Sequence, residues 1–356
     1  MKTNKGIYNL FFQIPILLFC LSCIHMQDTE QKKIQYTFER LEKFDPFPVT
    51  PIKDPKRVKL VPGNIAINEE IRRFSAELNQ AVSEKSEDLN KINIINDIFI
   101  FTKEKLFEIL LNDQPTQGWI KEIFSGNYQP SEEFLFVAKT FEYNLLFDKY
   151  FPKINYPEID GNKIKGRISN QTKIIPHHLS YKDNQLESKA LTAPCIESAK
   201  ILYDSNIKEL RRIAEDQIEK AYIFYNELIV YYNTQFIEEL TIAGTDQLSL
   251  HTSELERHSL EINNLIGKLN YSTDILQGLK LYLISFVVLS KQILVEWERS
   301  YLISAELAKE INIQNARDEY RLYVLEVSIN FNAAIQKQDK IFEEVINNCY
   351  DQGFGH

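Results

Sequence analysis

The longest regular pattern in this chain is a stretch without proline, from Cys195 to Tyr350. The protein has 12 prolines, and the last of them is Pro194. An uninterrupted helical array is the structure that tolerates such a stretch without a helix breaker. From Ala199 to Phe236 the apolar residues recur about every 3.7 residues, as in a straight α-helix rather than a left-handed coiled coil. The pattern predicts an all-α fold with an elongated antiparallel helical bundle over residues 192–350.

Polar and glycine-containing breaks divide this stretch further. Gly244 predicts the end of a first helix that begins with Pro194 in its opening turn, where a missing amide costs nothing. The segment Gly267–Ser272 contains the best candidate turn, and Asn312–Asn315 predicts a further break. The expected helices cover residues 192–243, 248–268, 273–310 and 316–349.

The most apolar segment of the chain, Leu281–Ser290, lies between two lysines. Ten uncharged residues are too few to cross a bilayer as a helix, which needs about 20. A helix that is apolar on all sides is normally a central core helix, and we expect that role here. The alternative is a concealed membrane-inserting element, as in helical pore-forming toxins.

The chain before the bundle predicts a smaller helical region over residues 65–150. Asn68 is a candidate cap for its first helix, and further helices are expected near residues 92–112, 119–124 and 131–150. Residues 151–191 contain prolines and glycines with little apolar periodicity. This segment is either an irregular linker between two helical regions or a long functional loop.

The N-terminus has the pattern of an export signal. Lys2 and Lys5 precede an apolar run from Ile7 to Cys20, and polar residues follow it. This run is short for a membrane-spanning helix and contains Pro15, so residues 1–23 predict a secretory signal peptide. Residues 24–64 contain five prolines and predict an extended tether.

The end of this signal, Leu18-Phe19-Cys20-Leu21-Ser22-Cys23, resembles the signal of a bacterial lipoprotein. In that class a small residue precedes a cysteine, which becomes lipid-modified and N-terminal after cleavage. The resemblance covers residues 1–23 only and implies lipidation at Cys23 and a membrane-anchored protein at the cell surface or in the periplasm. The alternative is cleavage into an ordinary secreted protein.

Charge is distributed unevenly along the chain. The formal net charge is −9, and the stretch Cys195–Tyr350 carries all of it, with 15 basic and 24 acidic residues. Nucleic-acid binding requires a basic face that neutralises phosphates, so the acidic half argues against a nucleic-acid partner. The rest of the chain is neutral.

Catalytic and cofactor signatures are largely missing from the sequence. It has no glycine-rich phosphate loop, no nucleophile elbow and no paired Cys-x-x-Cys motif, and we expect no cofactor. His251, Glu254 and His258 share one helix face and are a candidate site for a transition metal. Their alternative role is as ordinary surface residues.

Cys195 and Cys349 are the only cysteines outside the signal segment. An exported protein in an oxidising compartment tends to pair such residues. If the bundle has an even number of antiparallel helices, its two ends meet and a Cys195–Cys349 disulfide can form. The alternative is two independent thiols.

These patterns predict an exported, membrane-anchored helical protein that presents an acidic, tyrosine-bearing helical face to a protein partner and is not an enzyme. The alternatives are a membrane-acting toxin or effector that uses Leu281–Ser290, and a metal-binding bundle enzyme.

Overall fold

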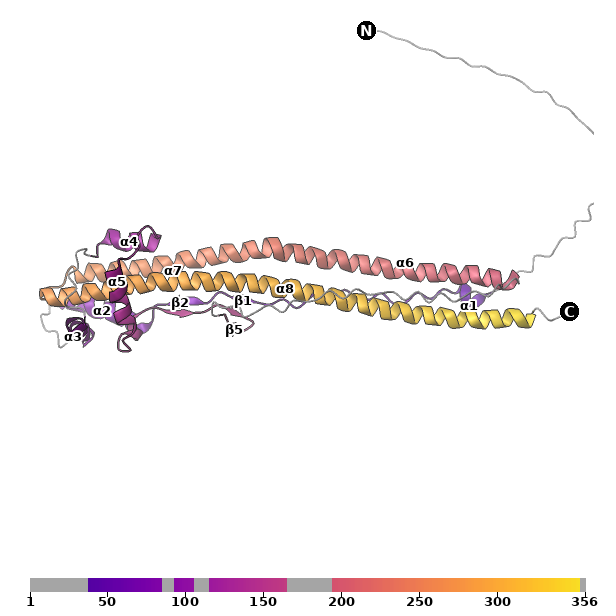
Figure 1. The fold of residues 1–356 in the computed structure, drawn as a ribbon, viewed down its shortest axis with the longest axis horizontal. Helices are drawn as coiled ribbons and strands as arrows, with labels where there is room; N and C mark the ends of the chain where they lie inside the picture. Colours follow the sequence, from indigo (N-terminus) through magenta and orange to yellow (C-terminus); the bar gives the residue numbers. More distant parts are fainter. Residues whose placement is uncertain (1–37, 85–92, 106–114, 165–193, 353–356) are drawn as a thin grey trace, which may run out of the picture.

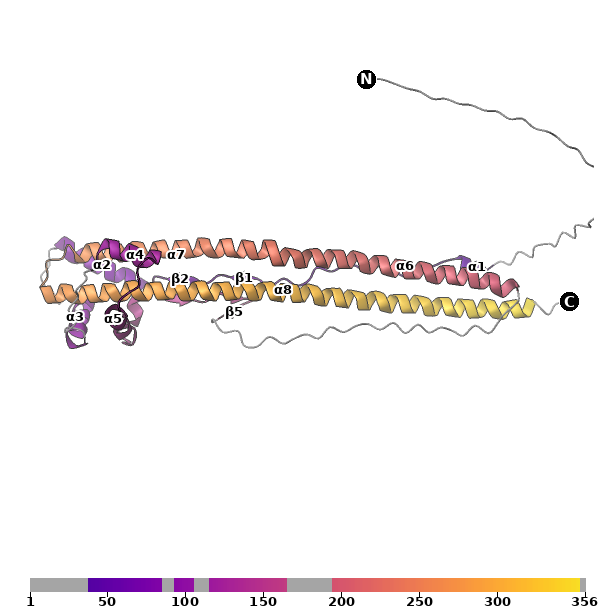
Figure 2. The ribbon, with the colours of Figure 1, turned by 45° about the horizontal axis from the view of Figure 1, so that its top comes forward.

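Two antiparallel helical rods form the axis of the protein (Figure 1). The computed structural model describes residues 38–84, 93–105, 115–164 and 194–352. The first rod consists of α6 (Pro194–Tyr231), the π-helical segment η3 (Tyr232–Phe236) and α7 (Ile237–Ile266). The second rod is the single helix α8 (Thr273–Gln352), whose 80 residues extend for about 120 Å at 1.5 Å per residue. A second view confirms that the two rods lie side by side over their whole length (Figure 2).

This hairpin confirms the predicted all-α fold and the elongated antiparallel arrangement of long helices. The predicted turn is also present, because α7 ends at Ile266, Gly267 is its C-terminal cap and α8 begins at Thr273. The chain therefore reverses direction only once between Pro194 and Gln352.

The predicted helix end at Gly244 is wrong, because α7 continues through this residue. A Cβ atom built on Gly244 would lie 2.3 Å from the ring of Tyr301 on α8. Such a distance is impossible without displacing the ring. The Tyr301 hydroxyl also donates a hydrogen bond to the Leu240 carbonyl at 2.6 Å. The glycine thus permits close packing of the two rods and does not terminate a helix.

The predicted break at Asn312–Asn315 is also wrong, because α8 is continuous there. Asn312 and Asn315 bind the backbone of a segment far away in sequence. The Asn312 Oδ1 atom accepts a hydrogen bond from the Val58 amide at 2.9 Å, and the Asn315 Nδ2 atom donates to the Lys56 carbonyl at 2.8 Å. Asn312 and Asn315 therefore serve tertiary contacts and do not end the helix.

Residues 38–66, which we call the strap, run along the hairpin from one end to the region of α2 (Figures 1 and 2). The strap begins with the short helix α1 (Glu39–Glu42) and continues without regular structure to β1 (Leu60–Val61) and β2 (Asn64–Ala66). This arrangement differs from the predicted solvated tether over residues 24–64, whose first part lies outside the described residues. Its prolines keep the chain extended, and the extended chain packs on the helices.

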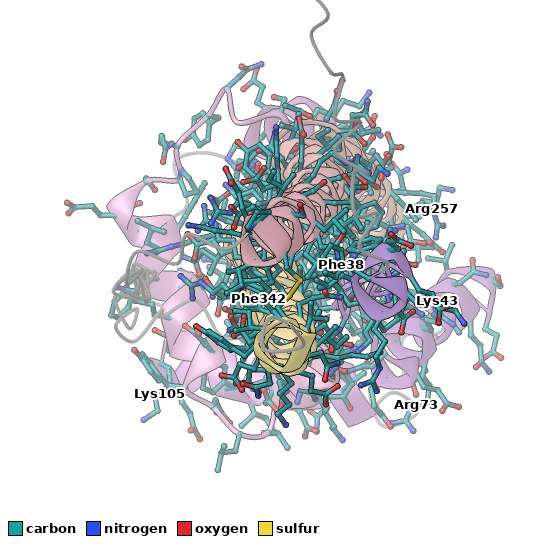
Figure 3. All side chains as sticks on the ribbon, turned by 90° about the vertical axis from the view of Figure 1, so that its right-hand side faces the viewer. Phe38, Lys43, Arg73, Lys105, Arg257 and Phe342 are labelled. Atoms are coloured by element: carbon teal, nitrogen blue, oxygen red, sulfur yellow. A yellow bond between two sulfur atoms is a disulfide. The ribbon has the colours of Figure 1, made fainter. Side chains whose placement is uncertain are left out.

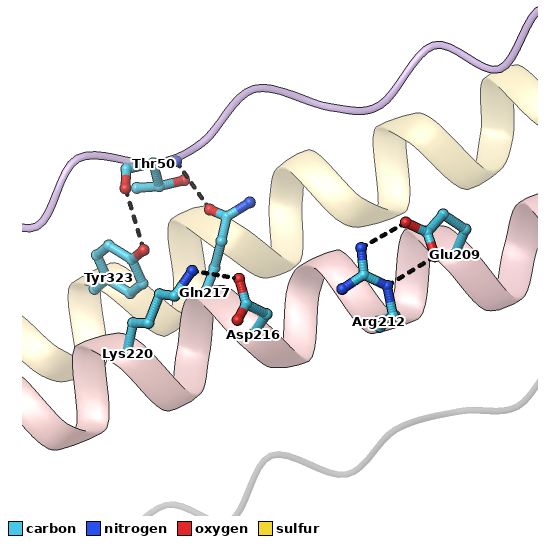
Figure 4. Close-up of polar contacts among 7 residues, drawn as sticks. All are labelled: Thr50, Glu209, Arg212, Asp216, Gln217, Lys220 and Tyr323. Carbon is cyan, nitrogen blue, oxygen red and sulfur yellow. Dashed lines mark hydrogen bonds and ion pairs between the residues drawn. The ribbon is translucent and has the colours of Figure 1, made fainter.

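Side chains from both rods satisfy the polar backbone of the strap. The Thr50 amide donates to Gln217 Oε1 at 2.9 Å, and the Thr50 carbonyl accepts from the Tyr323 hydroxyl at 3.1 Å (Figure 4). Further bonds join Tyr225 to the Lys53 carbonyl at 2.8 Å and Asn206 to the Leu41 carbonyl at 2.8 Å. A buried backbone group must find such partners, so these contacts determine where the strap lies.

The chain that leaves the head returns to the end of the strap through short antiparallel pairs. β2 pairs with β3 (Lys153–Asn155), and β1 pairs with β4 (Glu158–Ile159), which also pairs with β5 (Asn162–Lys163). Gly63 has a φ of 70°, and a Cβ atom there would lie 2.2 Å from the Asn155 carbonyl oxygen. The described part of the predicted 151–191 linker is therefore ordered by pairing, and residues 165–191 lie outside the described residues.

Four short helices surround one end of the hairpin and form what we call the head (Figure 1). They are α2 (Glu69–Glu84), α3 (Asn93–Lys105), α4 (Gln117–Ser125) and α5 (Glu132–Glu142). Asn68 caps α2 through its Oδ1 atom, which accepts from the Ile71 amide at 3.0 Å, and Ser131 caps α5 in the same way. The described part of the predicted helical region of residues 65–150 thus consists mainly of helices, although α5 ends earlier than expected.

The opposite end of the hairpin, which we call the base, is closed covalently. A disulfide joins Cys195, at the start of α6, to Cys349, near the end of α8, with the Cα atoms 5.9 Å apart. Figure 3 looks along the hairpin from this end and shows the disulfide beside Phe38 and Phe342. The cysteines are 154 residues apart, and the chain-entropy model assigns such a loop a stabilisation of about 5 kcal/mol.

We predict that Gln217→Ala lowers the free energy of unfolding by about 1–3 kcal/mol, because the buried Thr50 amide loses its acceptor. Urea unfolding followed by circular dichroism measures this change. Lys220→Ala is the matched control on the same helix, since its ion pair with Asp216 is solvent-exposed and contributes about 0–1 kcal/mol. Equal effects of the two substitutions would contradict the role of Gln217.

Candidate functional site

The head lies at the end of the protein that is distant from the base, and it covers the most apolar part of α8. All ten residues of Leu281–Ser290 are buried. Tyr282 is at the centre of an aromatic cluster, with its ring 4.9 Å from Phe74 and 6.0 Å from Phe141. Its hydroxyl donates to the Tyr150 carbonyl at 2.8 Å, and complete burial raises its pKa.

By length and composition, α8 resembles a helix that crosses a membrane, but core helices of water-soluble proteins resemble one too. Of its most apolar 18-residue window, 72% is buried inside the protein. The packing around Leu281–Ser290 is the packing expected of a core helix, because α2 to α5 and α7 supply apolar side chains around it.

A cleft of about 610 Å³ opens between α2 and α7, next to β2. This volume is within the usual range for sites that hold small molecules. Its lining residues come from three elements distant in sequence: Asn64, Ile65, Ala66 and Ile67 around β2; Arg72, Ser75, Ala76 and Asn79 of α2; and Glu254, Arg257, His258 and Glu261 of α7.

A buried Ser–His pair forms the floor of this cleft. The Ser75 Oγ atom lies 3.2 Å from His258 Nε2, and His258 Nδ1 lies 3.9 Å from a carboxylate oxygen of Glu261. Ser75 is 6% exposed and His258 is 5% exposed. The shorter contact is a hydrogen bond, and the longer one is an electrostatic contact beyond hydrogen-bond length.

Burial keeps the imidazole of His258 neutral. The pKa of His258 is lowered to about 4, mainly because burial removes water from the charged form and secondarily because Arg257 and Arg72 are close. A neutral ring has one donor and one acceptor, so it accepts or donates a single hydrogen bond at each nitrogen. The floor of the cleft is therefore polar and uncharged at neutral pH.

Charged side chains surround the cleft above this floor. Arg72 extends from α2 and makes no ion pair with any residue that the structure describes. Arg257 extends from α7 and lies 3.7 Å from Glu261, with 72% of its side chain exposed. Together the two guanidinium groups place positive charge on both sides of the cleft, and the Glu261 carboxylate partly neutralises one of them.

The order serine, histidine, carboxylate is also that of a nucleophile with its general base and orienting group. Two features of the cleft do not favour this chemistry. Ser75 lies in the middle of α2, where backbone N–H groups are already bonded within the helix and do not form an oxyanion hole. The low pKa of His258 also makes it a weak base. The arrangement is better suited to binding than to acyl transfer.

The structure does not assemble the predicted metal site. His251 and His258 are buried, whereas Glu254 is exposed at the edge of the cleft. The His251 ring contacts Trp297 at 5.1 Å, and the His258 ring contacts Phe286 at 5.6 Å and Ser75. Within residues 38–84, 93–105, 115–164 and 194–352, no group of three potential ligands is placed to hold a metal ion.

The three side chains separate because a straight α-helix rotates by 100° at each residue. His251, Leu255, His258 and Ile262 follow one another at intervals of four, three and four residues and form the buried face of α7. Glu254 lies beside this face. The two histidines are therefore core residues. This role is neither the metal site nor the surface position that the sequence suggested.

Sequence reasoning missed Ser75, Arg72 and Arg257 as site residues. The available signal was a serine on the apolar face of α2, where Ile71, Phe74 and Leu78 are buried around it. A buried polar residue needs a partner, and that partner lies on α7, 183 positions later. The Ser75–His258 contact depends on the packing of α2 against α7, so the sequence of either helix alone does not predict it.

The head also exposes apolar side chains around the end of α5. The exposed fraction is 57% for Phe136, 81% for Tyr143, 92% for Leu145 and 47% for Leu146. The buried rings of Phe141 and Phe147 lie 5.2 Å apart and hold both ends of this turn, so the residues between them point outward. We call Phe136, Tyr143, Leu145 and Leu146 the head patch.

No known protein family, curated protein or solved structure matches this chain. The fold and the site together define an all-α protein in which a long helical hairpin, closed at its base and lined by an extended strap, carries a small helical head.

We predict that His258 makes the head less stable in acid. The folded-state pKa of about 4 lies below the ordinary value of 6.5, so the unfolded chain takes up the proton first as the pH falls. The free energy of unfolding therefore has its full value above pH 6.5, and it decreases by up to about 3 kcal/mol as the pH falls to 4. Glutamine does not titrate, so His258→Gln should not show this loss of stability.

Urea unfolding of both proteins at pH 7 and pH 5 measures the difference. Carboxylates titrate in both proteins, so the gap between the two pH dependences isolates His258. Identical pH dependences for the wild type and His258→Gln would contradict a buried neutral imidazole.

Proposed function

We propose that this protein is an exported, lipid-anchored stalk that holds its head away from a membrane to bind a protein partner. The observation that carries this proposal is the position of Phe38. This first described residue lies at the base, in a cluster with both cysteines, while the head lies at the other end of the hairpin (Figures 1 and 3). Phe38 and the head are thus separated by nearly the length of α8.

The length of chain before the base is consistent with anchoring through Cys23. Phe38 follows Cys23 by 15 residues, and a chain of that length reaches at most about 50 Å when fully extended. A lipid on Cys23 therefore keeps the base close to the membrane. Since α8 extends for about 120 Å, an upright hairpin holds the head well beyond the reach of the anchor.

The hairpin has the construction of a stiff spacer. α8 is continuous over 80 residues, and the strap is bonded to both rods at several points. The disulfide prevents the two rods from separating at the base. A pull on the N-terminal chain is transmitted to the rods through the strap, because Asn206 and Gln217 hold its backbone.

The head patch is the surface that we propose for the partner. Protein interfaces are enriched in aromatic and aliphatic side chains that are exposed in the free protein, and four such residues cluster here. The acidic helical half was expected to present its tyrosines. Five of its 11 tyrosines are instead used inside the protein, because Tyr225, Tyr232, Tyr282, Tyr301 and Tyr323 are buried.

The role proposed here is non-enzymatic and uses no cofactor. The acidic charge of the stalk supports a protein partner over nucleic acid, because phosphate groups would be repelled along most of its length.

We expect a fluorophore at Lys340 to transfer energy efficiently to an acceptor dye in the membrane, and one at Asp274 to transfer little. Both positions are exposed on α8, about 100 Å apart along its axis. The measurement uses the lipidated protein in vesicles, with each fluorophore introduced as a non-natural amino acid. Cys23→Ala is the control and should leave the vesicle fraction. Equal transfer from the two positions would contradict an upright stalk.

We also expect a photo-crosslinking amino acid at Leu145 to capture a discrete protein on intact cells that express this chain. Ile201 is the matched control, since it is an exposed apolar residue near the base, with 65% of its surface accessible against 92% for Leu145. Adduct formation at Leu145 alone, abolished by Tyr143→Ser, supports the head patch. The absence of an adduct at Leu145, or the same adduct at both positions, would show that the patch is not the binding surface.

A further inference from the structure

We propose that the cleft between α2 and α7 binds a small organic carboxylate that carries an apolar group. This inference is independent of the stalk function, because it depends only on the residues that line the cleft. Three features lead to it: two arginines above the cleft, a neutral polar floor and an apolar wall on one side.

The arginines supply the recognition of the carboxylate. Arg72 on α2 and Arg257 on α7 line the same cleft as His258, so positive charge faces the cleft from both helices. A guanidinium group binds a carboxylate through two parallel hydrogen bonds. Arg72 is available for this purpose, because it has no ion pair among the described residues.

The floor adds a hydrogen-bond donor without adding charge. When His258 carries its proton on Nε2, it donates to Ser75 Oγ at 3.2 Å, and the hydroxyl proton of Ser75 is directed to another acceptor. Ser75 lines the cleft, so a carboxylate held by the arginines is a suitable acceptor. In this tautomer the pair acts as a neutral donor beneath a ligand that already has two cations beside it.

The wall beside β2 determines what else the ligand carries. Ile65, Ala66 and Ile67 line this side, and Ala76 of α2 also lines the cleft. Apolar groups of the ligand gain about 25 cal/mol for each Å² removed from water against such a surface. A carboxylate with a single methyl group, such as acetate, makes few of these apolar contacts.

Glu261 sets the strength of binding. Its carboxylate lies 3.7 Å from Arg257 and competes with the ligand for that guanidinium group. Glu254 adds a second negative charge to the edge of the cleft. The site is therefore of moderate affinity, and removing one of these charges strengthens it.

Two sources share this chemistry, namely short-chain fatty acids and the C-terminus of a peptide that ends in an apolar residue. Hexanoate represents the first source and N-acetyl-leucine the second. Hexanamide and N-acetyl-leucinamide are the uncharged partners of the two probes. Binding of one carboxylate in preference to the other distinguishes the sources.

Isothermal titration of the purified full-length protein tests the proposal. We expect at least one carboxylate to bind and its amide partner to bind at least tenfold more weakly. Arg72→Gln should weaken carboxylate binding about tenfold, the usual effect of losing a charge-assisted hydrogen bond. Glu261→Gln should strengthen binding about twofold to fivefold, because Arg257 is released.

Arg73→Gln is the matched control. Arg73 is the neighbouring arginine on α2, but it is paired with Glu70 and Glu77 and does not line the cleft, so binding should be unchanged. All three substituted residues are exposed to solvent, and circular dichroism confirms that the variants fold. Equal binding of acids and amides, no binding of either acid, or equal effects of Arg72→Gln and Arg73→Gln would overturn the proposal.

Discussion

An extended chain that packs on helices has backbone amides and carbonyls that no regular structure satisfies, and this protein satisfies them with side chains. Gln217 and Asn206 of the first rod and Asn312 of the second, all buried, bond to the backbone of the strap. Each bond contributes little by itself, but an unmade bond in the interior costs about 1–3 kcal/mol. The strap therefore has one favourable position along the hairpin.

This constraint organises the remaining parts of the molecule. Because the strap starts at the base and ends at β2, the head helices that follow it are placed at the far end of the hairpin. The β2–β3 and β1–β4 pairs then secure the chain as it leaves the head. At the base, the disulfide holds the two rods together where the hairpin has no turn to connect them. The separation of base and head thus follows from the docking of the strap.

The head combines two surfaces with different chemistry. The head patch is apolar and solvent-exposed, which suits a protein partner, and the cleft beside β2 is polar, arginine-bearing and concave, which suits a small anion. The cleft contains His258, which the sequence offered as one candidate metal ligand beside a surface role. Its true neighbours are Ser75 and Phe286, so the histidine contributes a neutral hydrogen-bonding group to the core beneath the cleft.

The sequence alone was sufficient to predict the helical character of residues 194–352, the turn at Gly267–Ser272 and the buried role of Leu281–Ser290, because apolar periodicity and capping are local properties of the chain. It also singled out Cys195 and Cys349 as the pair at the ends of the helical half. It was misleading at Gly244 and Asn312, where residues that usually end helices instead make room for Tyr301 and bind the strap. An extended strap and a cleft between α2 and α7 have no periodic signature. Only the tertiary structure brings Ser75 to His258 across 183 residues, since contact between distant segments depends on their packing and not on either segment alone.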